Sequence, residues 1–282
     1  MKLKKVVFLF VLILLLSGCT ERDVQNPANP PSRRDPDENV ERLSDEADGY
    51  KKIHIYVALC DNKNQGIVPV PEAIGNGQDA NNNLYWGTAY GVRTFFKNSD
   101  DWKLIIQTDD PQKHVLQRVI FFNRAAKAYI VADAYDGKYI KDAITNALRA
   151  MSGANQDVVV IEDKKFIFGG GADLVAYVGH DGLMEFDVDV TLKPRDDKRR
   201  DAIILACKSS QYFEEYIKNT EANPLLWTTQ LMAPEAYTVE AAIKGWLKSE
   251  TDEQIHERAA QAYNQYQKCG IQGARGLFKT GF

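Results

Sequence analysis

The chain of 282 residues lacks the motifs that mark several common classes of enzyme. It contains no P-loop, HExxH, GxSxG or CxxC pattern, and the run Gly169–Gly171 precedes a strand, whereas a dinucleotide-binding fingerprint follows one. A strong charge imbalance is also missing, because the formal net charge is -4, so nothing favours binding to nucleic acid. We therefore expect no metal, no cofactor and no nucleic-acid partner.

Long apolar runs are scarce, and the one that stands out lies at the N-terminus. Basic residues precede the run Val6–Leu16, which is too short to span a bilayer comfortably, and small residues follow it. This order predicts a signal peptide over residues 1–18. The ending Leu16-Ser17-Gly18-Cys19 resembles the bacterial lipobox, which implies cleavage before Cys19 and attachment of a diacylglycerol to its sulfur. The alternative is an ordinary signal peptide with an incidental cysteine.

Residues 19–50 are rich in proline and charged side chains and almost free of large apolar ones. Such a segment cannot bury enough surface to offset its ordering entropy, so we expect a flexible tether. Thr20, which follows Cys19, is not an acidic residue. By resemblance to enteric bacteria, this implies a lipoprotein of the cell envelope that is anchored in the outer membrane and faces the periplasm.

Residues 51–282 are long enough for one sizeable α/β domain. Apolar, β-branched runs alternate with segments of helical period, which indicates a mostly parallel sheet with helices on both faces. The predicted strands cover 53–60, 103–107, 118–122, 128–132, 158–161, 166–168, 173–179, 185–192 and 202–206. The predicted helices cover 84–96, 138–151, 211–218, 238–248 and a last segment that opens with a capping box at Thr251 and Gln254 and ends at Gly270. A long loop over 63–82 is expected to be functional or disordered.

Two of these strands end on reactive residue types. The run 173–179 is followed by His180, and the run 202–206 is followed by Cys207. If the two strands lie side by side and parallel, both residues emerge at the carboxyl edge of the sheet, where open α/β folds place their sites. A thiol beside an imidazole is a nucleophile with its base.

This pattern resembles the caspase-like cysteine peptidases, in which one apolar strand ends in His and Gly and a second ends in Ala-Cys. The resemblance implies a three-layer sandwich in which Cys207 is the nucleophile, His180 donates the proton to the leaving amine, and the amides of Gly182 or Cys207 form the oxyanion hole. Asp181 departs from the family pattern because it separates His180 from Gly182. Lys208, where many caspases carry an acidic residue, would favour the thiolate of Cys207.

Other carboxylates have two interpretations each. Asp61 ends the first strand, where it either receives a basic substrate side chain or, as we favour, bonds its own turn. Glu185, Asp187 and Asp189 alternate with apolar residues, so they would share one face of a strand. They either bind a cation or a basic peptide or, as we favour, form a solvated edge. The basic loop 193–200 is either a processing site or an exposed charged loop.

Apart from Cys19, the cysteines are Cys60, Cys207 and Cys269. An oxidising compartment permits a disulfide, but Cys60 and Cys207 end apolar strands, so we expect three unpaired thiols.

The function expected is that of a lipid-anchored cysteine endopeptidase acting on a peptide or protein of the envelope. One alternative is a non-enzymatic envelope lipoprotein that uses the same fold for binding or as a scaffold. A second alternative is a lipoprotein that binds a solute or an ion through the acidic strand.

Overall fold

The computed structural model describes residue 45 and residues 49–282, which belong to one compact unit. The predicted signal peptide, Cys19 and most of the predicted tether therefore lie outside the described residues. Within the described part of the chain, no helix has the length and apolar character needed to cross a membrane.

In the part of the chain that the structure describes, eight strands form one sheet in the order β10-β9-β8-β7-β1-β4-β3-β2, and two more form a separate hairpin. The sheet strands are β1 (Lys51–Ala58), β2 (Lys103–Gln112), β3 (Val115–Asn123), β4 (Ala128–Tyr135), β7 (Leu174–Val178), β8 (Asp201–Leu205), β9 (Asn223–Thr228) and β10 (Phe278–Lys279). The hairpin consists of β5 (Gln156–Ile161) and β6 (Lys164–Gly169).

The centre of the sheet is parallel, as its continuous apolar strands predicted. β4, β1, β7, β8 and β9 pair in parallel, and β2, β3 and β10 add antiparallel strands at the two sides. The predicted strands that lead to Cys60, Gly179 and Ala206 are consecutive neighbours, because β1 pairs with β7 and β7 pairs with β8. The fold class predicted from the sequence is confirmed.

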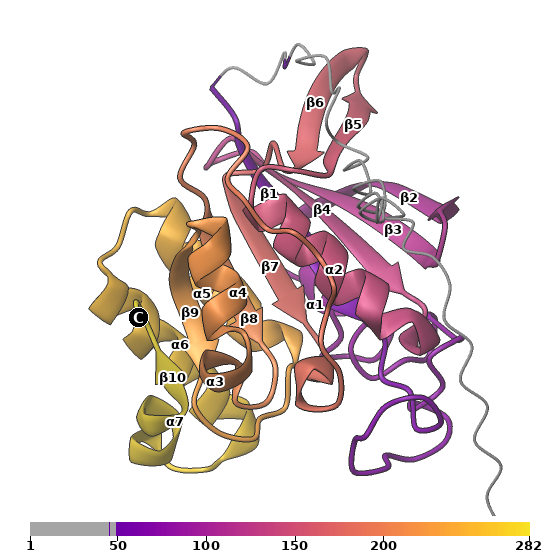
Figure 1. Cartoon of the computed structure of the whole chain (residues 1–282), viewed down its shortest axis with the longest axis vertical. Coiled ribbons are helices and arrows are strands. Elements are labelled where there is room, and N and C mark those ends of the chain that lie inside the picture. The colour runs from indigo at the N-terminus through magenta and orange to yellow at the C-terminus, as the bar shows by residue number, and fades with distance from the viewer. Residues whose placement is uncertain (1–44, 46–48) are drawn as a thin grey trace, which may run out of the picture. The chain divides into compact units, whose positions relative to one another are not determined.

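Among the described residues, seven α-helices cover the sheet on both faces (Figure 1). They are α1 (Val92–Lys97), α2 (Ile140–Met151), α3 (Ser209–Tyr212), α4 (Glu214–Thr220), α5 (Ala236–Leu247), α6 (Asp252–Gln267) and α7 (Ile271–Leu277). One core packs α1, α5, α6 and α7 against side chains such as Ile53, Ile55 and Val57 of β1. The other packs α2 and α4 against the opposite face, which carries Tyr56 and Ala58.

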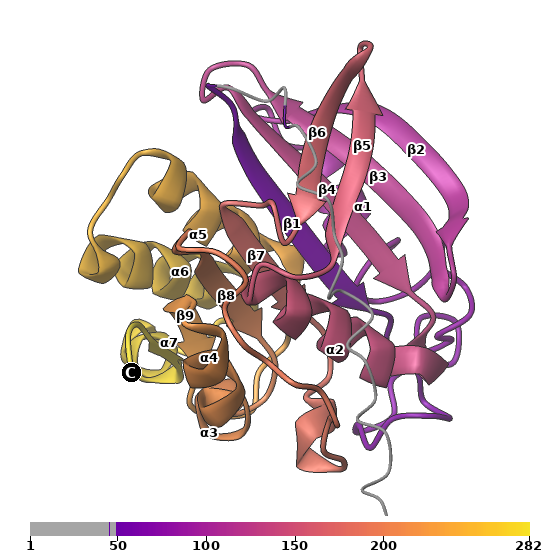
Figure 2. The ribbon, with the colours of Figure 1, turned by 45° about the horizontal axis from the view of Figure 1, so that its top comes forward.

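The hairpin β5–β6 covers the same sheet face as α2, over strands β3 and β4 (Figure 2). A small apolar cluster joins it to the sheet and includes Ile120 and Val131 from the sheet and Phe166 and Phe168 from the hairpin. The sequence predicted its two strands over 158–161 and 166–168, and both form and pair antiparallel.

Several elements differ from the sequence-based predictions, among them α7 and β10, for which the sequence predicted nothing. The helix expected over 84–96 is reduced to α1, because 84–91 forms tight turns in which Gly87 approaches the Asn81 carbonyl too closely for a Cβ. The strand expected over 185–192 is wrong, since this segment pairs with no strand. Strand β9 was missed because Pro224 weakens a strand pattern, yet it pairs with β8 across a bulge.

Candidate functional site at the carboxyl edge

His180 and Cys207 follow neighbouring strand ends on the same edge of the sheet. β7 and β8 are in parallel register with Val178 opposite Leu205, and the Gly179 amide donates to the Leu205 carbonyl at 3.2 Å. One residue follows each strand before the residue of interest, Gly179 before His180 and Ala206 before Cys207, so both residues lie beyond the carboxyl ends of neighbouring strands. The arrangement predicted from the two strand-end patterns is therefore present in the backbone.

The His180 side chain is held by a carboxylate. Its Nε2 lies 2.7 Å from Glu185 Oε1, and the residue is 7% exposed. Its backbone carbonyl accepts hydrogen bonds from the Tyr177 hydroxyl at 2.7 Å and from the Gly182 amide at 3.1 Å. No hydrogen bond joins His180 to Cys207 in the part of the chain that the structure describes.

The Cys207 thiol is half-buried and contacts the backbone of Met232. Its Sγ donates to the Met232 carbonyl at 3.7 Å and accepts from the Met232 amide at 3.5 Å. Burial raises the pKa of this thiol, the Met232 amide lowers it in part, and Asp181 raises it further. Lys208 acts in the predicted direction, but its effect is too small to produce a lowered thiol pKa.

Of the two amides predicted for the oxyanion hole, the Gly182 amide already has an acceptor. It donates to the His180 carbonyl within a turn that leads into the 3₁₀ helix Gly182–Met184. Among the described residues, no hydrogen bond from the Cys207 amide is found. The Cys207 amide is thus the better placed of the two to receive the oxygen of a substrate carbonyl.

Asp181, the departure from the family pattern, is a fully buried carboxyl group. Its Oδ1 accepts from the Leu183 amide at 3.1 Å, whereas its Oδ2 has no partner among the described residues. Burial raises the pKa of Asp181 to about 7, against the effect of the Leu183 amide, and Glu185 raises it further. The Asp181 carboxyl therefore titrates close to neutral pH, and the neutral form predominates only below about pH 7.

Asp61 is saturated by its own loop. It is 1% exposed, and its carboxylate accepts from the amides of Lys63 and Asn64 and from the side chains of Asn64 and Gln78. Burial acts to raise its pKa, but these hydrogen bonds outweigh burial and leave the pKa below its ordinary value. This geometry favours the turn-forming role of Asp61 over contact with a substrate.

The acidic segment after His180 keeps its alternation without forming a strand. Val188 and Leu192 are buried in the core beside α2 and α4, while Asp187 and Asp189 are exposed. Period-2 burial therefore arises from an extended segment packed on helices. The expected strand face of three carboxylates is absent here, and Glu185 is bonded to His180.

Two residues near the site carried no pattern that sequence reasoning detected. Asn83, directly after the long loop, binds both the amide and the carbonyl of Cys60, which fixes this part of the chain at the end of β1. Tyr85 is buried beside the Cys60 thiol, and its pKa is raised by burial and then by the proximity of Cys60 and Cys207. The segment that directly follows the long loop thus lines the same edge as Cys207, although its sequence gives no sign of which residue reaches the Cys60 thiol.

The three described cysteines are free thiols. Cys60 is buried, and burial raises its pKa to about 11 despite the hydrogen bond with Tyr85. Cys269 is exposed. Their environments therefore differ enough for a thiol reagent to separate them.

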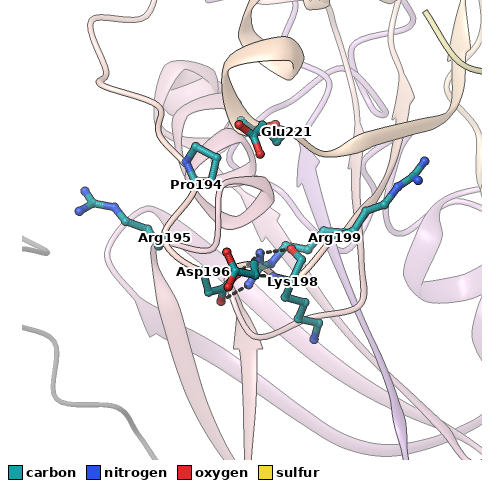
Figure 3. A pocket seen from close by; sticks show the side chains of 9 residues that line it. Pro194, Arg195, Asp196, Lys198, Arg199 and Glu221 are labelled. Carbon is teal, nitrogen blue, oxygen red and sulfur yellow. Dashed lines mark hydrogen bonds and ion pairs between the residues drawn. The ribbon is translucent and has the colours of Figure 1, made fainter.

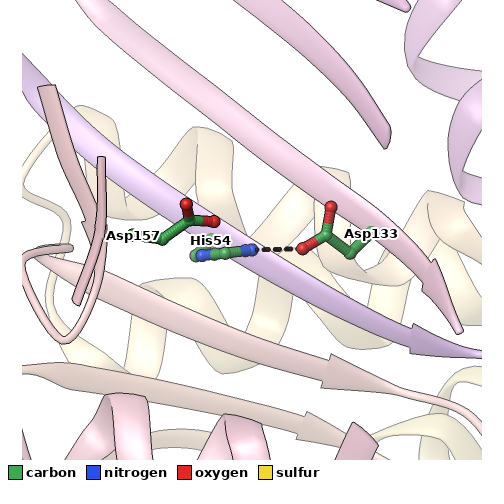
Figure 4. A group of neighbouring side chains, drawn as sticks. All are labelled: His54, Asp133 and Asp157. Carbon is green, nitrogen blue, oxygen red and sulfur yellow. Dashed lines mark hydrogen bonds and ion pairs between the residues drawn. The ribbon is translucent and has the colours of Figure 1, made fainter. Parts of the chain in front are cut away.

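A second polar cluster lies in mid-sheet under the hairpin (Figure 4). His54, Asp133 and Asp157 are close enough to hold a metal ion. Arg118, however, pairs twice with Asp133 and once with Asp157, and both ring nitrogens of His54 are engaged, by Asp133 and by the Gly169 amide. The guanidinium is thus the cation of this cluster, which links the hairpin to the sheet.

The basic loop 193–200 borders a cavity of about 560 Å³ at the opposite edge of the sheet. Arg200 is buried and pairs with Asp196, and Lys198 pairs with Asp173. Arg195 and Arg199 also line the cavity, and their guanidinium ends point away from each other (Figure 3). With Arg200 and Lys198 they make four basic side chains against three acidic ones (Asp196, Asp197 and Glu221), so the lining is nearly balanced in charge.

Comparison with known proteins adds no relative, because the chain matches no protein-family profile, no curated protein and no solved structure.

Proposed function

We propose that this protein is a lipid-anchored cysteine hydrolase of the bacterial cell envelope that cleaves a peptide or protein through Cys207 and His180. The observation that carries the proposal is the parallel pairing of β7 with β8, which brings the two residues out at one edge of the sheet. This juxtaposition, together with the resemblance of the two strand ends to caspase-like peptidases, supports acyl transfer over other chemistries.

The chemistry proposed begins with a neutral thiol, because burial raises the pKa of Cys207. His180 accepts the thiol proton as Sγ attacks the scissile carbonyl, and the Cys207 amide donates to the developing oxyanion. Collapse of the adduct breaks the C–N bond, and His180 delivers its proton to the leaving amine. Water then hydrolyses the thioester and restores the thiol.

The decisive experiment measures peptide cleavage with a library that covers each residue type before the scissile bond. Cys207→Ala should abolish turnover, and His180→Ala should lower kcat by about 10²–10⁴-fold, since His180 handles the proton. Their combination should cost little more than Cys207→Ala alone, because the two groups act in one step. Cys269→Ala, at an exposed thiol that takes no part in the proposed mechanism, is the matched control and should be silent.

A non-enzymatic role on the same fold is the second candidate. It is favoured by the contacts of the two side chains, because His180 bonds Glu185 and Cys207 bonds Met232. A covalent probe directed at thiols separates the two functions. Retained turnover in Cys207→Ala would remove the proposed mechanism, and neither turnover nor probe labelling in the folded wild type would favour the binding or scaffold role.

A further inference from the structure

Glu185 reaches His180 from a segment whose backbone is itself fixed. Asp181 caps the 3₁₀ helix Gly182–Met184, and the Glu185 amide then donates to the Gly182 carbonyl at 2.9 Å. This short turn returns the chain so that Glu185 Oε1 lies 2.7 Å from His180 Nε2. The carboxylate is thus presented to the imidazole by local structure within six residues of sequence.

We propose that Glu185 is the positioning residue for His180 and completes a Cys207–His180–Glu185 arrangement, an inference that rests on the proposed function. A carboxylate accepts hydrogen bonds and does not donate them, so the Nε2 atom that faces Glu185 carries the proton. The neutral ring then has its lone pair on Nδ1, for which no partner is found among the described residues. Nδ1 is therefore the atom that takes the Cys207 proton.

The consequence for the reaction concerns charge. When the thiol proton moves to Nδ1, the imidazole becomes a cation, and Glu185 lies in hydrogen-bond contact with that cation. A charged hydrogen bond of this kind is about twice as strong as a neutral one, and here it strengthens as the proton is transferred. Glu185 thereby favours the thiolate–imidazolium state that a buried thiol does not reach on its own.

Gly66 in the long loop leaves room for the Glu185 carboxylate. A Cβ built at Gly66 would lie 1.9 Å from Glu185 Oε1, so the carboxylate occupies the space that any larger residue would fill. Gly66 is exposed and has no positive φ, so alanine is compatible with its backbone. The Gly66→Ala variant therefore displaces the carboxylate while leaving the chemistry of Glu185 unchanged.

Two variants and two controls test the proposal. Glu185→Gln keeps the shape but removes the charge, and Gly66→Ala keeps the charge but moves it. Asp189→Asn, on the same segment, and Gly273→Ala, where a Cβ meets nothing within 4 Å, are the matched controls. All are made in a Cys269→Ser background, so that alkylation at the exposed thiol does not obscure Cys207.

Three readouts are measured on each folded protein. Nitrogen-15 NMR of the His180 ring should show the Nε2–H tautomer in the wild type and both controls, and a mixture of tautomers in the two test variants. The alkylation rate of Cys207 by iodoacetamide at neutral pH should fall in both test variants. With a peptide substrate, kcat should fall about 10–10²-fold at unchanged KM, less than for a fully buried orienting carboxylate, because the Glu185 side chain is 39% exposed.

The results separate failure of this inference from failure of the proposed function. Absence of turnover in every protein removes the peptidase, while the tautomer and the alkylation rate still report on Glu185. An Nδ1–H tautomer in the wild type, or tautomer and alkylation unchanged in both test variants, would overturn the positioning role. Faster alkylation in Glu185→Gln would also overturn it, because Glu185 would then restrain His180.

Discussion

At the scale of single residues, Asp181 makes the free energy of unfolding depend on pH. Its carboxyl group is buried, one oxygen is unpartnered, and the pKa is raised to about 7. In the unfolded chain an aspartate titrates near 3.9, so between about pH 4 and pH 7 the folded state binds more protons than the unfolded state. The stability contributed by the protonated form is complete below pH 4 and is lost as the pH rises through 7.

Asp181→Asn tests this linkage, because asparagine cannot ionise but can still accept from the Leu183 amide. We expect the free energy of unfolding of the variant, relative to wild type, to rise by up to about 3 kcal/mol between pH 4.5 and pH 8. Urea unfolding at several pH values measures this difference. Asp189→Asn, at an exposed carboxylate, should show no such trend, and a pH-independent difference for Asp181→Asn would exclude the raised pKa.

At the scale of elements, the buried polar cluster under the hairpin connects the hairpin to the sheet. Asp133 has its pKa lowered to about 2: burial alone would raise it, but the hydrogen bonds from Arg118 and His54 outweigh burial. Arg118 also reaches Asp157 on β5, and the Gly169 amide at the end of β6 donates to His54. Both hairpin strands are therefore connected to the sheet through one ionic network.

Arg118→Met should weaken the attachment of the hairpin to the sheet. Removing one partner of a buried ion pair leaves Asp133 uncompensated, so we expect a loss of about 3–5 kcal/mol in the free energy of unfolding. Native-state hydrogen exchange should show faster exchange at amides 156–169 than in strands β1 and β7. Arg199→Met, at an exposed arginine, is the control, and equal protection of the hairpin in both variants would contradict the proposed link.

At the scale of the whole molecule, the start of β1 and the candidate site lie at opposite ends of the sheet strands. β1 starts at Lys51 and runs parallel to β7 and β8, so residues 207 and 180 lie beyond the opposite end of the strands. Eight residues at about 3.3 Å each separate the two ends by roughly 26 Å. The end of the sheet that carries the candidate site is therefore remote from the point at which the preceding segment enters.

The predicted lipid anchor is tested on the intact protein purified from bacterial membranes. We expect mass spectrometry to find a mature N-terminus at Cys19 that carries a diacylglycerol, because several acyl chains on one cysteine give stable anchoring. Cys19→Ala should remain uncleaved or leave the membrane fraction. An unmodified Cys19 in the mature wild type would contradict the predicted lipid anchor and favour an ordinary signal peptide over residues 1–18.

The sequence by itself determined the features that depend on local pattern. Continuous β-branched runs predicted the parallel strands that end at Cys60, Gly179 and Ala206, and the spacing of Thr251 and Gln254 predicted the capping box that opens α6. These succeed because burial on both faces and the first turn of a helix are encoded by residues a few positions apart. The positions of His180 and Cys207 at one edge follow from the same patterns.

The tertiary structure alone decided which partners these side chains have. Met232 reaches Cys207 from 25 residues away, and the loop that holds Gly66 packs on Glu185 from more than 100 residues away. The alternation over 185–192 predicts burial on one side, which the structure shows, and a strand, which it does not show. Helices packed against an extended segment bury its alternate residues as well as a neighbouring sheet would, so alternation alone does not identify a strand. Partners brought together by long loops leave no periodic trace in the sequence, because their contact depends on packing and not on spacing.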